Sequence, residues 1–432
     1  MALFGTAGIR GPVAEVTPSL ALRVGRAMAG VISSGESEAS VVVGRDGRTT
    51  GQAMAAALTA GLVSGGLSVR RVGQVPTPAL AFASQTRFGV MLTASHNPPA
   101  DTGIKLFVDG VEFDSEHEGE VEGAVQANEP PVDWDRWGTV ERADVLDRYL
   151  NRLVSYGRSH GTEPGSLAVA DDSGNGMASV ATPRLLRRLG ASVESINSHV
   201  DGRFPGRTSK PTPETIDDLC RFVADGPASV GFAHDGDADR VVVVDEFGEV
   251  VHEDTVVAIL AEHYVRTSGV ADPVVITTPN ASARIDERVE AVGGRVTRVA
   301  LGALHEGIAA ARDRGDHVVF AGEPWKHLHP ELGGWIDGVA SAAVLTGLIA
   351  EAGGLDNLRA PVSEPPYRKV SVACPGPKKR PAIAKLATSL PGRFPEATVS
   401  DEFGVQLDLD ADAWILVRPS GTEPYIRIYA EG

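Results

Sequence analysis

The chain has 432 residues, of which 42% are hydrophobic and 22% charged, which is typical of a folded protein with several hydrophobic cores. Its formal net charge of −17 disfavours binding to a nucleic-acid backbone or an anionic membrane surface. No apolar run approaches the roughly 18 residues of a membrane helix, and no secretion signal is visible at the start. Cys220 and Cys374 lie far apart, so we expect no disulfide framework and a cytoplasmic location.

One pattern recurs along most of the chain. An apolar, β-branched run ends in a polar loop rich in glycine or aspartate, and an alanine- and leucine-rich helical stretch follows. Buried parallel strands have such continuous apolar runs, and ligands of these domains lie beyond the carboxyl ends of the strands. We therefore predict doubly wound α/β domains, with strands within 40–48, 166–178, 229–240 and 317–324 and helices within 184–191 and 255–265.

The residues from about Leu358 onward have a different pattern. Proline-rich connections, alternating hydrophobicity in residues 369–376 and 414–421, and a last strand within 425–432 indicate a small α+β domain. Charged, proline-bearing segments near residues 128–140 and 358–369 are typical of linkers. The predicted architecture is three doubly wound α/β domains followed by one C-terminal α+β domain, divided as 1–140, 141–249, 250–357 and 358–432.

Three aspartates alternate in the segment DGDADR, at positions Asp235, Asp237 and Asp239. Carboxylates at this spacing on a turning backbone can converge on one hard cation such as Mg²⁺. A calcium-binding EF-hand is one alternative, because Glu246 falls where its last ligand would stand. Arg240 occupies the position that needs glycine, however, and the run VVVVD that follows predicts a strand instead of a helix. A solvated acidic turn without a metal is the second alternative.

The segment TASHNP places Ser95 beside His96 in a loop after the apolar run 89–92. Adjacent side chains on an extended chain point in opposite directions, so we expect a poor nucleophile–base pair. Ser95 can instead carry a phosphoryl group, since three aspartates leave an octahedral Mg²⁺ short of ligands and phosphate oxygens commonly complete its shell. The ion would offset the phosphate charge and act as a Lewis acid in phosphoryl transfer.

The segment RPSGTEP joins two predicted strands near the C-terminus. An arginine fork, hydroxyl groups and exposed backbone N–H groups together suit a phosphate. Alone the segment is a weak signal, because a Ser-Gly-Thr turn is usually only a turn. The residues that could form this phosphate clamp are Arg418, Ser420, Gly421 and Thr422.

Five segments resemble those of the α-D-phosphohexomutases, a family of phosphoglucomutases, phosphomannomutases and phosphoglucosamine mutases, and they follow one another along the chain in the order found in that family. The resemblance spans essentially the whole chain, and TASHNP together with DGDADR is its most specific part. It implies four domains around a central cleft, a Mg²⁺-dependent enzyme and a small phosphosugar substrate. We expect a monomer or homodimer that binds neither nucleic acid nor membrane. The segments are FGTAGIRG (4–11), TASHNP (93–98), DGDADR (235–240), Gly-Glu followed by histidine (322–327) and RPSGTEP (418–424).

The resemblance also implies a role for each matching residue. Ser95 would be the phosphoserine, and its phosphate would bind Mg²⁺ together with the three aspartates. Arg10 and Lys105 would act as general acid or base near the reacting hydroxyl, while His96 would support the phosphoserine loop. The remaining matches would bind substrate: Arg240 beside the metal loop, Glu323 and His327 in the sugar-reading loop, and Arg418, Ser420, Gly421 and Thr422 at the non-reacting phosphate.

The chain departs from the family in the sugar-reading loop, which commonly runs Gly-Glu-x-Ser-Gly-His. Here Trp325 replaces the small serine and Lys326 replaces the glycine, so the backbone path and the pocket shape must differ. Trp325 either stacks on a sugar face or packs at a domain interface. An earlier loop, residues 301–303, reads Leu-Gly-Ala and lacks a carboxylate that relatives often carry.

The implied activity is a mutase. Phospho-Ser95 would donate to the sugar, the sugar 1,6-bisphosphate would reorient, and the other phosphate would return to Ser95. The net result would exchange sugar 1-phosphate for sugar 6-phosphate, with the bisphosphate as activator. We expect glucose or mannose phosphate, with glucosamine phosphate and pentose phosphate as alternatives. A phosphosugar phosphatase and a non-catalytic sugar-phosphate sensor are also considered, but the clamp at 418–422 favours the mutase and Ser95 disfavours the sensor.

Overall fold

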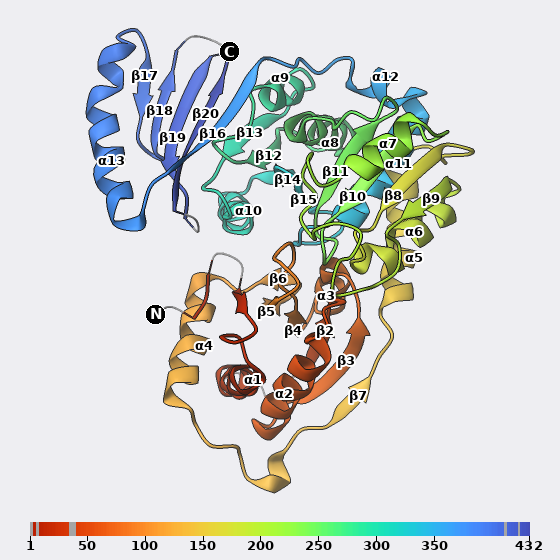
Figure 1. Cartoon of the computed structure of the whole chain (residues 1–432), viewed down its shortest axis with the longest axis vertical. Coiled ribbons are helices and arrows are strands. Elements are labelled where there is room, and N and C mark those ends of the chain that lie inside the picture. The colour runs from red at the N-terminus through yellow and green to blue at the C-terminus, as the bar shows by residue number, and fades with distance from the viewer. Residues whose placement is uncertain (1–2, 6–7, 34–39, 410–412, 422–423) are drawn as a thin grey trace. The chain divides into compact units, whose positions relative to one another are not determined.

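The structure is a computed structural model that describes residues 3–5, 8–33, 40–409, 413–421 and 424–432 (Figure 1). The chain forms two compact units, one of residues Met1–Glu253 and Trp325–Arg359 and the other of Asp254–Pro324 and Ala360–Gly432. Among the described residues, no helix combines the length and apolar character needed to cross a membrane.

The first sheet of the first unit has the strand order β1-β5-β4-β2-β3-β7, with the short β6 paired to β5. Its central strands β4, β2 and β3 are parallel, and buried valines such as Val43 and Val90 face one another across β2 and β4. The strands are β1 (Ile9–Pro12), β2 (Ser40–Arg45), β3 (Ser68–Gln74), β4 (Phe88–Leu92), β5 (Asp101–Val108), β6 (Val111–Glu112) and β7 (Val140–Arg142).

Four helices accompany this sheet: α1 (Pro18–Ser33), α2 (Gly51–Ser64), α3 (Thr77–Ala83) and α4 (Ser115–Ala127). Helices α1 and α2 approach one another closely because Gly61 has no side chain, since a Cβ there would lie 2.1 Å from the carbonyl oxygen of Leu22. Buried apolar residues of both helices and of the sheet form one continuous core. This core supports the carboxyl ends of β2 and β4, where the loops that carry Asp46 and Ser95 begin.

The second sheet of the first unit has the order β11-β10-β8-β9, built from β8 (Ala168–Asp172), β9 (Ser192–Ile196), β10 (Val230–His234) and β11 (Val241–Asp245). Strand β10 is parallel to β8, and it pairs antiparallel with β11 through the loop 235–240. Helix α11 packs on α5 and α6. The helices that accompany the sheet are α5 (Leu146–Ser159), α6 (Thr182–Leu189), α7 (Asp217–Ala224), α11 (Gly338–Ala352) and α12 (Leu355–Arg359), and the short strand β15 (Lys326–Leu328) belongs to the same unit.

The second unit contains a parallel layer, in which β12 (Pro273–Thr277) lies between β13 (Arg295–Arg298) and β14 (His317–Glu323). Its helices are α8 (Glu253–Thr267), α9 (Arg284–Glu290) and α10 (Leu304–Asp313). The C-terminal sheet of this unit is antiparallel, with the order β16-β20-β19-β18-β17 and helix α13 (Gly376–Ser389) packed on it. Its strands are β16 (Tyr367–Ala373), β17 (Thr398–Ser400), β18 (Val405–Asp408), β19 (Trp414–Pro419) and β20 (Tyr425–Glu431).

The mixed α/β class is confirmed, and two local expectations can now be decided. The EF-hand is excluded, because β11 pairs with β10 where that motif requires a helix. Arg418 lies within β19 and not in the loop after it, which is a correction to the sequence-based placement. The four domain limits remain a prediction.

Candidate active site

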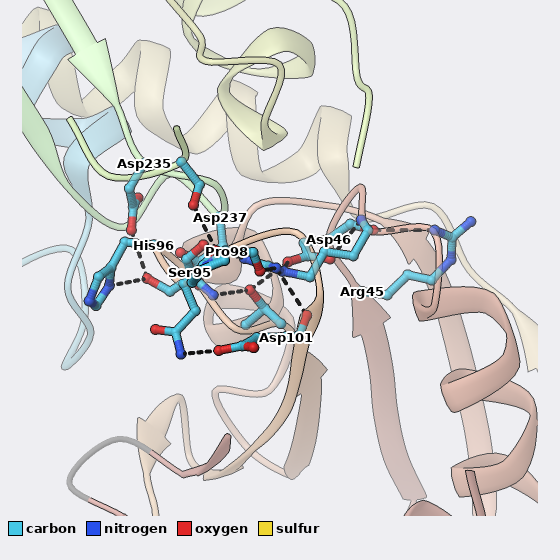
Figure 2. A network of polar contacts seen from close by, with 12 residues as sticks. Arg45, Asp46, Ser95, His96, Pro98, Asp101, Asp235 and Asp237 are labelled. Carbon is cyan, nitrogen blue, oxygen red and sulfur yellow. Dashed lines mark hydrogen bonds and ion pairs between the residues drawn. The ribbon is translucent and has the colours of Figure 1, made fainter. Parts of the chain in front are cut away.

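Ser95 lies in the loop after β4 and is almost completely buried, with 1% of its surface exposed. Its Oγ donates to Oδ2 of Asp235 at 2.7 Å and lies 3.2 Å from Nδ1 of His96 (Figure 2). The expectation that Ser95 and His96 point apart is therefore wrong. It assumed an extended chain, whereas Ser95 has a left-handed backbone with φ of 48°, which turns both side chains to the same side.

His96 is nevertheless a neutral imidazole. Burial lowers its pKa to about 2, helped by the positive charges of Arg240 and Arg10. The hydroxyl proton of Ser95 points to the carboxylate of Asp235, which accepts it at the shorter distance. The geometry thus agrees with a supporting position for His96, and its part in the chemistry remains a prediction.

The loop between β10 and β11 gathers Asp235, Asp237 and Asp239. One oxygen of each carboxylate lies within 4.8 Å of the others, and all three residues are buried. Oδ1 of Asp237 and Oδ1 of Asp239 have no hydrogen-bond partner, although buried carboxylate oxygens are normally paired. Buried, converging and unsatisfied oxygen atoms fit a hard divalent cation such as Mg²⁺. The solvated acidic turn is excluded by this burial.

The aspartates differ in their electrostatics. Burial raises the pKa of Asp235 well above its usual value, and the charges of Asp239 and Asp237 add to the effect. Burial would also raise the pKa of Asp239, but the nearby positive charges of Lys105 and Arg240 outweigh it and leave that pKa below its usual value. The three carboxylates thus have different electrostatic surroundings, and Asp239 is the one closest to the Lys105 ammonium, at 3.1 Å.

Lys105 is a buried residue of β5, where it pairs with Met91. Its Nζ lies 3.1 Å from Asp239, 3.6 Å from Asp237 and 3.2 Å from Glu112. Burial alone would lower the pKa of Lys105, but Glu112 and the two aspartates outweigh it and raise that pKa. The ammonium group is therefore charged and lies among the carboxylates.

The two predicted arginines of this region lie apart in the chain but in the same unit. The Nε of Arg240 is 3.8 Å from Asp235 and 3.7 Å from Asp239. Arg10 lies on β1, and its charge contributes to the low pKa of His96. The structure thus brings both arginines into the electrostatic surroundings of the Ser95 loop.

Sequence reasoning missed two residues that hold the metal-loop backbone and its aspartates. Thr77 at the start of α3 donates its hydroxyl to Oδ2 of Asp237 at 2.6 Å, and its N–H to the Asp237 carbonyl. Arg207 donates to the carbonyl of His234 at 2.7 Å and is held by Asp172 at 2.6 Å. Thr77 stands in the segment VPTPAL and Arg207 in FPGRTSKPTPE, and both segments are rich in proline but give no local sign of these contacts.

The end of the sugar-reading segment lies in the first unit. The Trp325 side chain packs, half-buried, against the core of the second sheet, and its carbonyl accepts from the N–H of Val241 at 3.2 Å. Its backbone is left-handed, with φ of 64°, which is unusual for a bulky residue. These contacts favour the packing role over sugar stacking. The backbones of Lys326 and Arg240 form an isolated antiparallel β-bridge. The positive charge of Lys326 also helps to lower the pKa of Asp239.

His327 is buried, at 1% exposure, and its Nδ1 lies 3.0 Å from the hydroxyl of Ser341. Burial lowers its pKa to about 3, so the imidazole is neutral. This predicted substrate ligand therefore lies within the first unit. In the sequence it directly follows Trp325 and Lys326, which are half-buried.

The other predicted substrate residues belong to the second unit. Glu323 ends β14 and is 8% exposed, while Arg418 pairs with Arg427 across β19 and β20. Ser420 is buried, and its carbonyl accepts from Nζ of Lys379 at 2.7 Å. Gly421 is exposed, and Thr422 lies outside the described residues.

Comparison with known proteins identifies the family of the chain. Three parts of the chain match the phosphoglucomutase/phosphomannomutase family: residues 1–131 match its alpha/beta/alpha domain I, residues 147–248 its alpha/beta/alpha domain II, and residues 377–432 its C-terminal domain. A phosphopentomutase of Thermococcus kodakarensis is 41% identical, over 100% of this chain and 94% of its own length. A probable phosphoglucosamine mutase of Methanopyrus kandleri is 40% identical, over 99% of this chain and 93% of its own length.

Solved structures support the same family. A phosphoglucomutase/phosphomannomutase family protein of Burkholderia thailandensis superposes with a TM-score of 0.86 and 25% sequence identity, covering 100% of this chain and 93% of that one. The architecture is therefore the four-domain arrangement predicted from the sequence. The chain belongs to the phosphoglucomutase/phosphomannomutase family, within the α-D-phosphohexomutase superfamily of isomerases.

Proposed function

We propose that the protein is a phosphosugar mutase that moves a phosphoryl group between the anomeric oxygen and the terminal hydroxyl of a sugar, with Ser95 as the carrier. The observation that supports this best is the 2.7 Å contact between the Ser95 hydroxyl and Asp235 inside a buried aspartate cluster. A hydroxyl that has only to bind substrate does not need such a setting. A phosphoryl carrier does, because a cation bound by the three aspartates would neutralise the charge of its phosphate.

Asp235, Asp237, Asp239 and the phosphorylated Ser95 would hold the metal, for which Mg²⁺ is the proposed ion. The ion would supply charge neutralisation and Lewis acidity at the phosphate. In the first step the bond between phosphorus and Ser95 Oγ breaks, and a bond from phosphorus to the sugar hydroxyl forms. Lys105, charged and buried beside the aspartates, is placed to stabilise the developing negative charge on oxygen.

The second half of the cycle reverses these roles. The sugar bisphosphate presents its other phosphate, and Ser95 Oγ takes it back while the sugar oxygen leaves. One proton must leave the attacking hydroxyl and one must reach the leaving oxygen. Arg10 and Lys105 are the proposed general acid or base groups, and the charged Lys105 would donate a proton to the leaving oxygen and then take up the proton that the attacking hydroxyl releases. The clamp of Arg418, Ser420, Gly421 and Thr422 would retain the intermediate, which distinguishes a mutase from a phosphatase.

For the substrate, the relatives shift the proposal away from glucose and mannose phosphates. We propose a pentose phosphate as the first choice, because the 41% identical relative over the whole chain is a phosphopentomutase. The altered segment Trp325-Lys326 supports a sugar other than the usual hexoses. Glucosamine phosphate is the second choice, since the Methanopyrus kandleri relative at 40% identity has that name.

A panel of sugar 1-phosphates tests this proposal. Ribose, glucosamine, glucose and mannose 1-phosphates are each incubated with protein, Mg²⁺ and the matching bisphosphate, and phosphorus NMR follows the conversion. The proposal expects the highest kcat/KM for the pentose phosphate and loss of activity with a chelator. Release of inorganic phosphate in place of the isomer would indicate a phosphatase. We also propose that the protein is a monomer or homodimer, which the molar mass of the same preparation in solution would test. A cytoplasmic location is proposed as well.

A further inference from the structure

Arg48 is one of the largest fully buried side chains of the chain, with 2% of its surface exposed, and it lies beneath the Ser95 loop. It follows β2 in the segment GRDGR, which would ordinarily be assigned to a polar surface turn. A buried guanidinium is costly unless all its N–H groups are paired. The hydrogen bonds of Arg48 therefore indicate why it is buried there.

All five N–H donors of this guanidinium have an acceptor. Its Nε donates to Asp46 at 3.0 Å. One terminal nitrogen donates to the carbonyls of Pro98 and Asp101, at 2.6 and 3.0 Å, and the other to the carbonyls of Ser95 and Asn97, at 2.8 and 2.7 Å. One side chain thus binds four carbonyl groups between residues 95 and 101. No other residue type offers five donors in a fixed plane.

The N–H of Ser95 is fixed by the same network. It donates to Oγ1 of Thr93 at 2.8 Å, and the Thr93 hydroxyl donates to Oδ2 of Asp46 at 2.7 Å. Asp46 therefore accepts from both Thr93 and Arg48, and both backbone polar groups of Ser95 lead to this pair. Figure 2 shows Asp46 on one side of Ser95 and Asp235 on the other.

This arrangement bears on the direction of the hydroxyl. Ser95 has a left-handed backbone, which a non-glycine residue keeps only where its surroundings impose it. The metal loop lies directly against the Ser95 carbonyl, since a Cβ on Gly236 would be 2.6 Å from that oxygen. A shift of this carbonyl would therefore change the position of Ser95 Oγ relative to Asp235.

We propose that Arg48 and Asp46 are positioning residues that hold Ser95 in its left-handed backbone conformation, so that its hydroxyl faces the metal-binding aspartates. The expected effect on kcat rests on the proposed function. The expected effect on the stability of the Ser95 loop does not. Phe204 packs on the guanidinium at 5.2 Å, and the Ser209 hydroxyl donates to the Asn97 carbonyl at 2.8 Å, so a second loop closes over the network.

The test compares Arg48→Lys with the matched control Arg284→Lys. Arg284 is also buried, at 1% exposure, and donates to Thr255 and Ser282 in the second unit. Lysine keeps the charge but has three donors, so it cannot bind four carbonyls. We expect Arg48→Lys to lower kcat about 100-fold while KM changes less than about threefold, because misplacement of a reacting group costs about that much. We expect Arg284→Lys to lower the melting temperature but to keep kcat.

Hydrogen exchange of the peptide spanning residues 93–101 gives a readout that does not depend on activity. It should become faster in Arg48→Lys and stay unchanged in Arg284→Lys. If the wild type shows no mutase activity, the proposed function fails, and the exchange result still decides whether Arg48 holds the loop. Unchanged exchange, an unchanged kcat or equal losses in both lysine variants would overturn the positioning role.

Should Arg48→Lys not fold, Asp46→Asn replaces it. This variant keeps the side-chain shape, but its amide nitrogen cannot accept from Thr93 or from Arg48. We expect kcat to fall about tenfold, equivalent to the loss of one hydrogen bond to a charged group, with faster exchange in residues 93–101. A wild-type kcat and wild-type exchange in this folded variant would equally overturn the proposal.

Discussion

The loops at residues 93–101 and 235–240 are held by hydrogen bonds that involve buried side chains, whereas Trp325 and Lys326 of the sugar-reading segment are less buried. Ser95, Asp235 and Asp237 are at most 1% exposed, and each has a named partner. Trp325 and Lys326 are only half-buried, and they are the residues that depart from the family pattern. The difference in burial fits the proposed division of labour, in which the two buried loops carry the phosphoryl chemistry and the less buried Trp325 and Lys326 influence the choice of sugar.

The largest effect should come from Ser95→Ala, which removes the phosphoryl carrier. Turnover of every sugar phosphate should fall by at least about 10⁴-fold, as for the loss of a catalytic nucleophile. The fold should persist, because the change deletes one hydroxyl and little packing. Rates from phosphorus NMR and a melting curve check both parts. An alanine variant with wild-type activity would remove the covalent role.

The next effect should come from Asp237→Asn, which replaces a negative oxygen donor by a neutral one. We expect kcat to fall on the order of 100-fold for all sugars alike and the activity to require more Mg²⁺. A titration of activity against Mg²⁺ checks this expectation. An unchanged metal requirement would show that the aspartate loop has no metal role. A loss for one sugar only would contradict the separation of chemistry from sugar choice.

A smaller effect should follow the substitution His96→Asn. This variant distinguishes a supporting role of His96 from a role as general base. Asparagine can replace the Nδ1 contact with Ser95, so we expect at most about a tenfold loss of kcat, the value of one hydrogen bond. Loss of a general base would cost about 10²–10⁴-fold instead. Single-turnover rates from phosphorylated protein distinguish the two outcomes.

The smallest effect should come from Trp325→Ser, and it should differ among sugars. A packed aromatic contact is worth about 0.5–1.5 kcal/mol, or roughly two- to tenfold. Releasing Trp325 from the core of the second sheet should alter the path of the segment and change the kcat/KM ratios among pentose, glucosamine, glucose and mannose phosphates by that factor. Phosphorylation of Ser95 should be unaffected. Equal losses for all sugars would show that Trp325 only packs.

The sequence predicts the strands well where burial produces a continuous apolar run, as in residues 40–45 and 230–234. The aspartate cluster is equally predictable, because its three members lie in one turn. The relative directions of the Ser95 and His96 side chains are harder to predict, because the left-handed backbone at Ser95 is held by contacts with residues distant in the sequence. Arginines are mostly exposed, so Arg48 gives no local sign of its burial.

The covalent cycle through Ser95 is the central claim, and one measurement tests it most directly. Protein phosphorylated by the sugar bisphosphate is freed of that compound and mixed with stoichiometric ribose 1-phosphate and Mg²⁺. Peptide mass spectrometry then follows Ser95, while phosphorus NMR follows the sugar. The account predicts that phosphate leaves Ser95 as sugar bisphosphate forms and returns to Ser95 as ribose 5-phosphate accumulates. Phosphate carried by another residue, or lost as inorganic phosphate without any isomer, would contradict it.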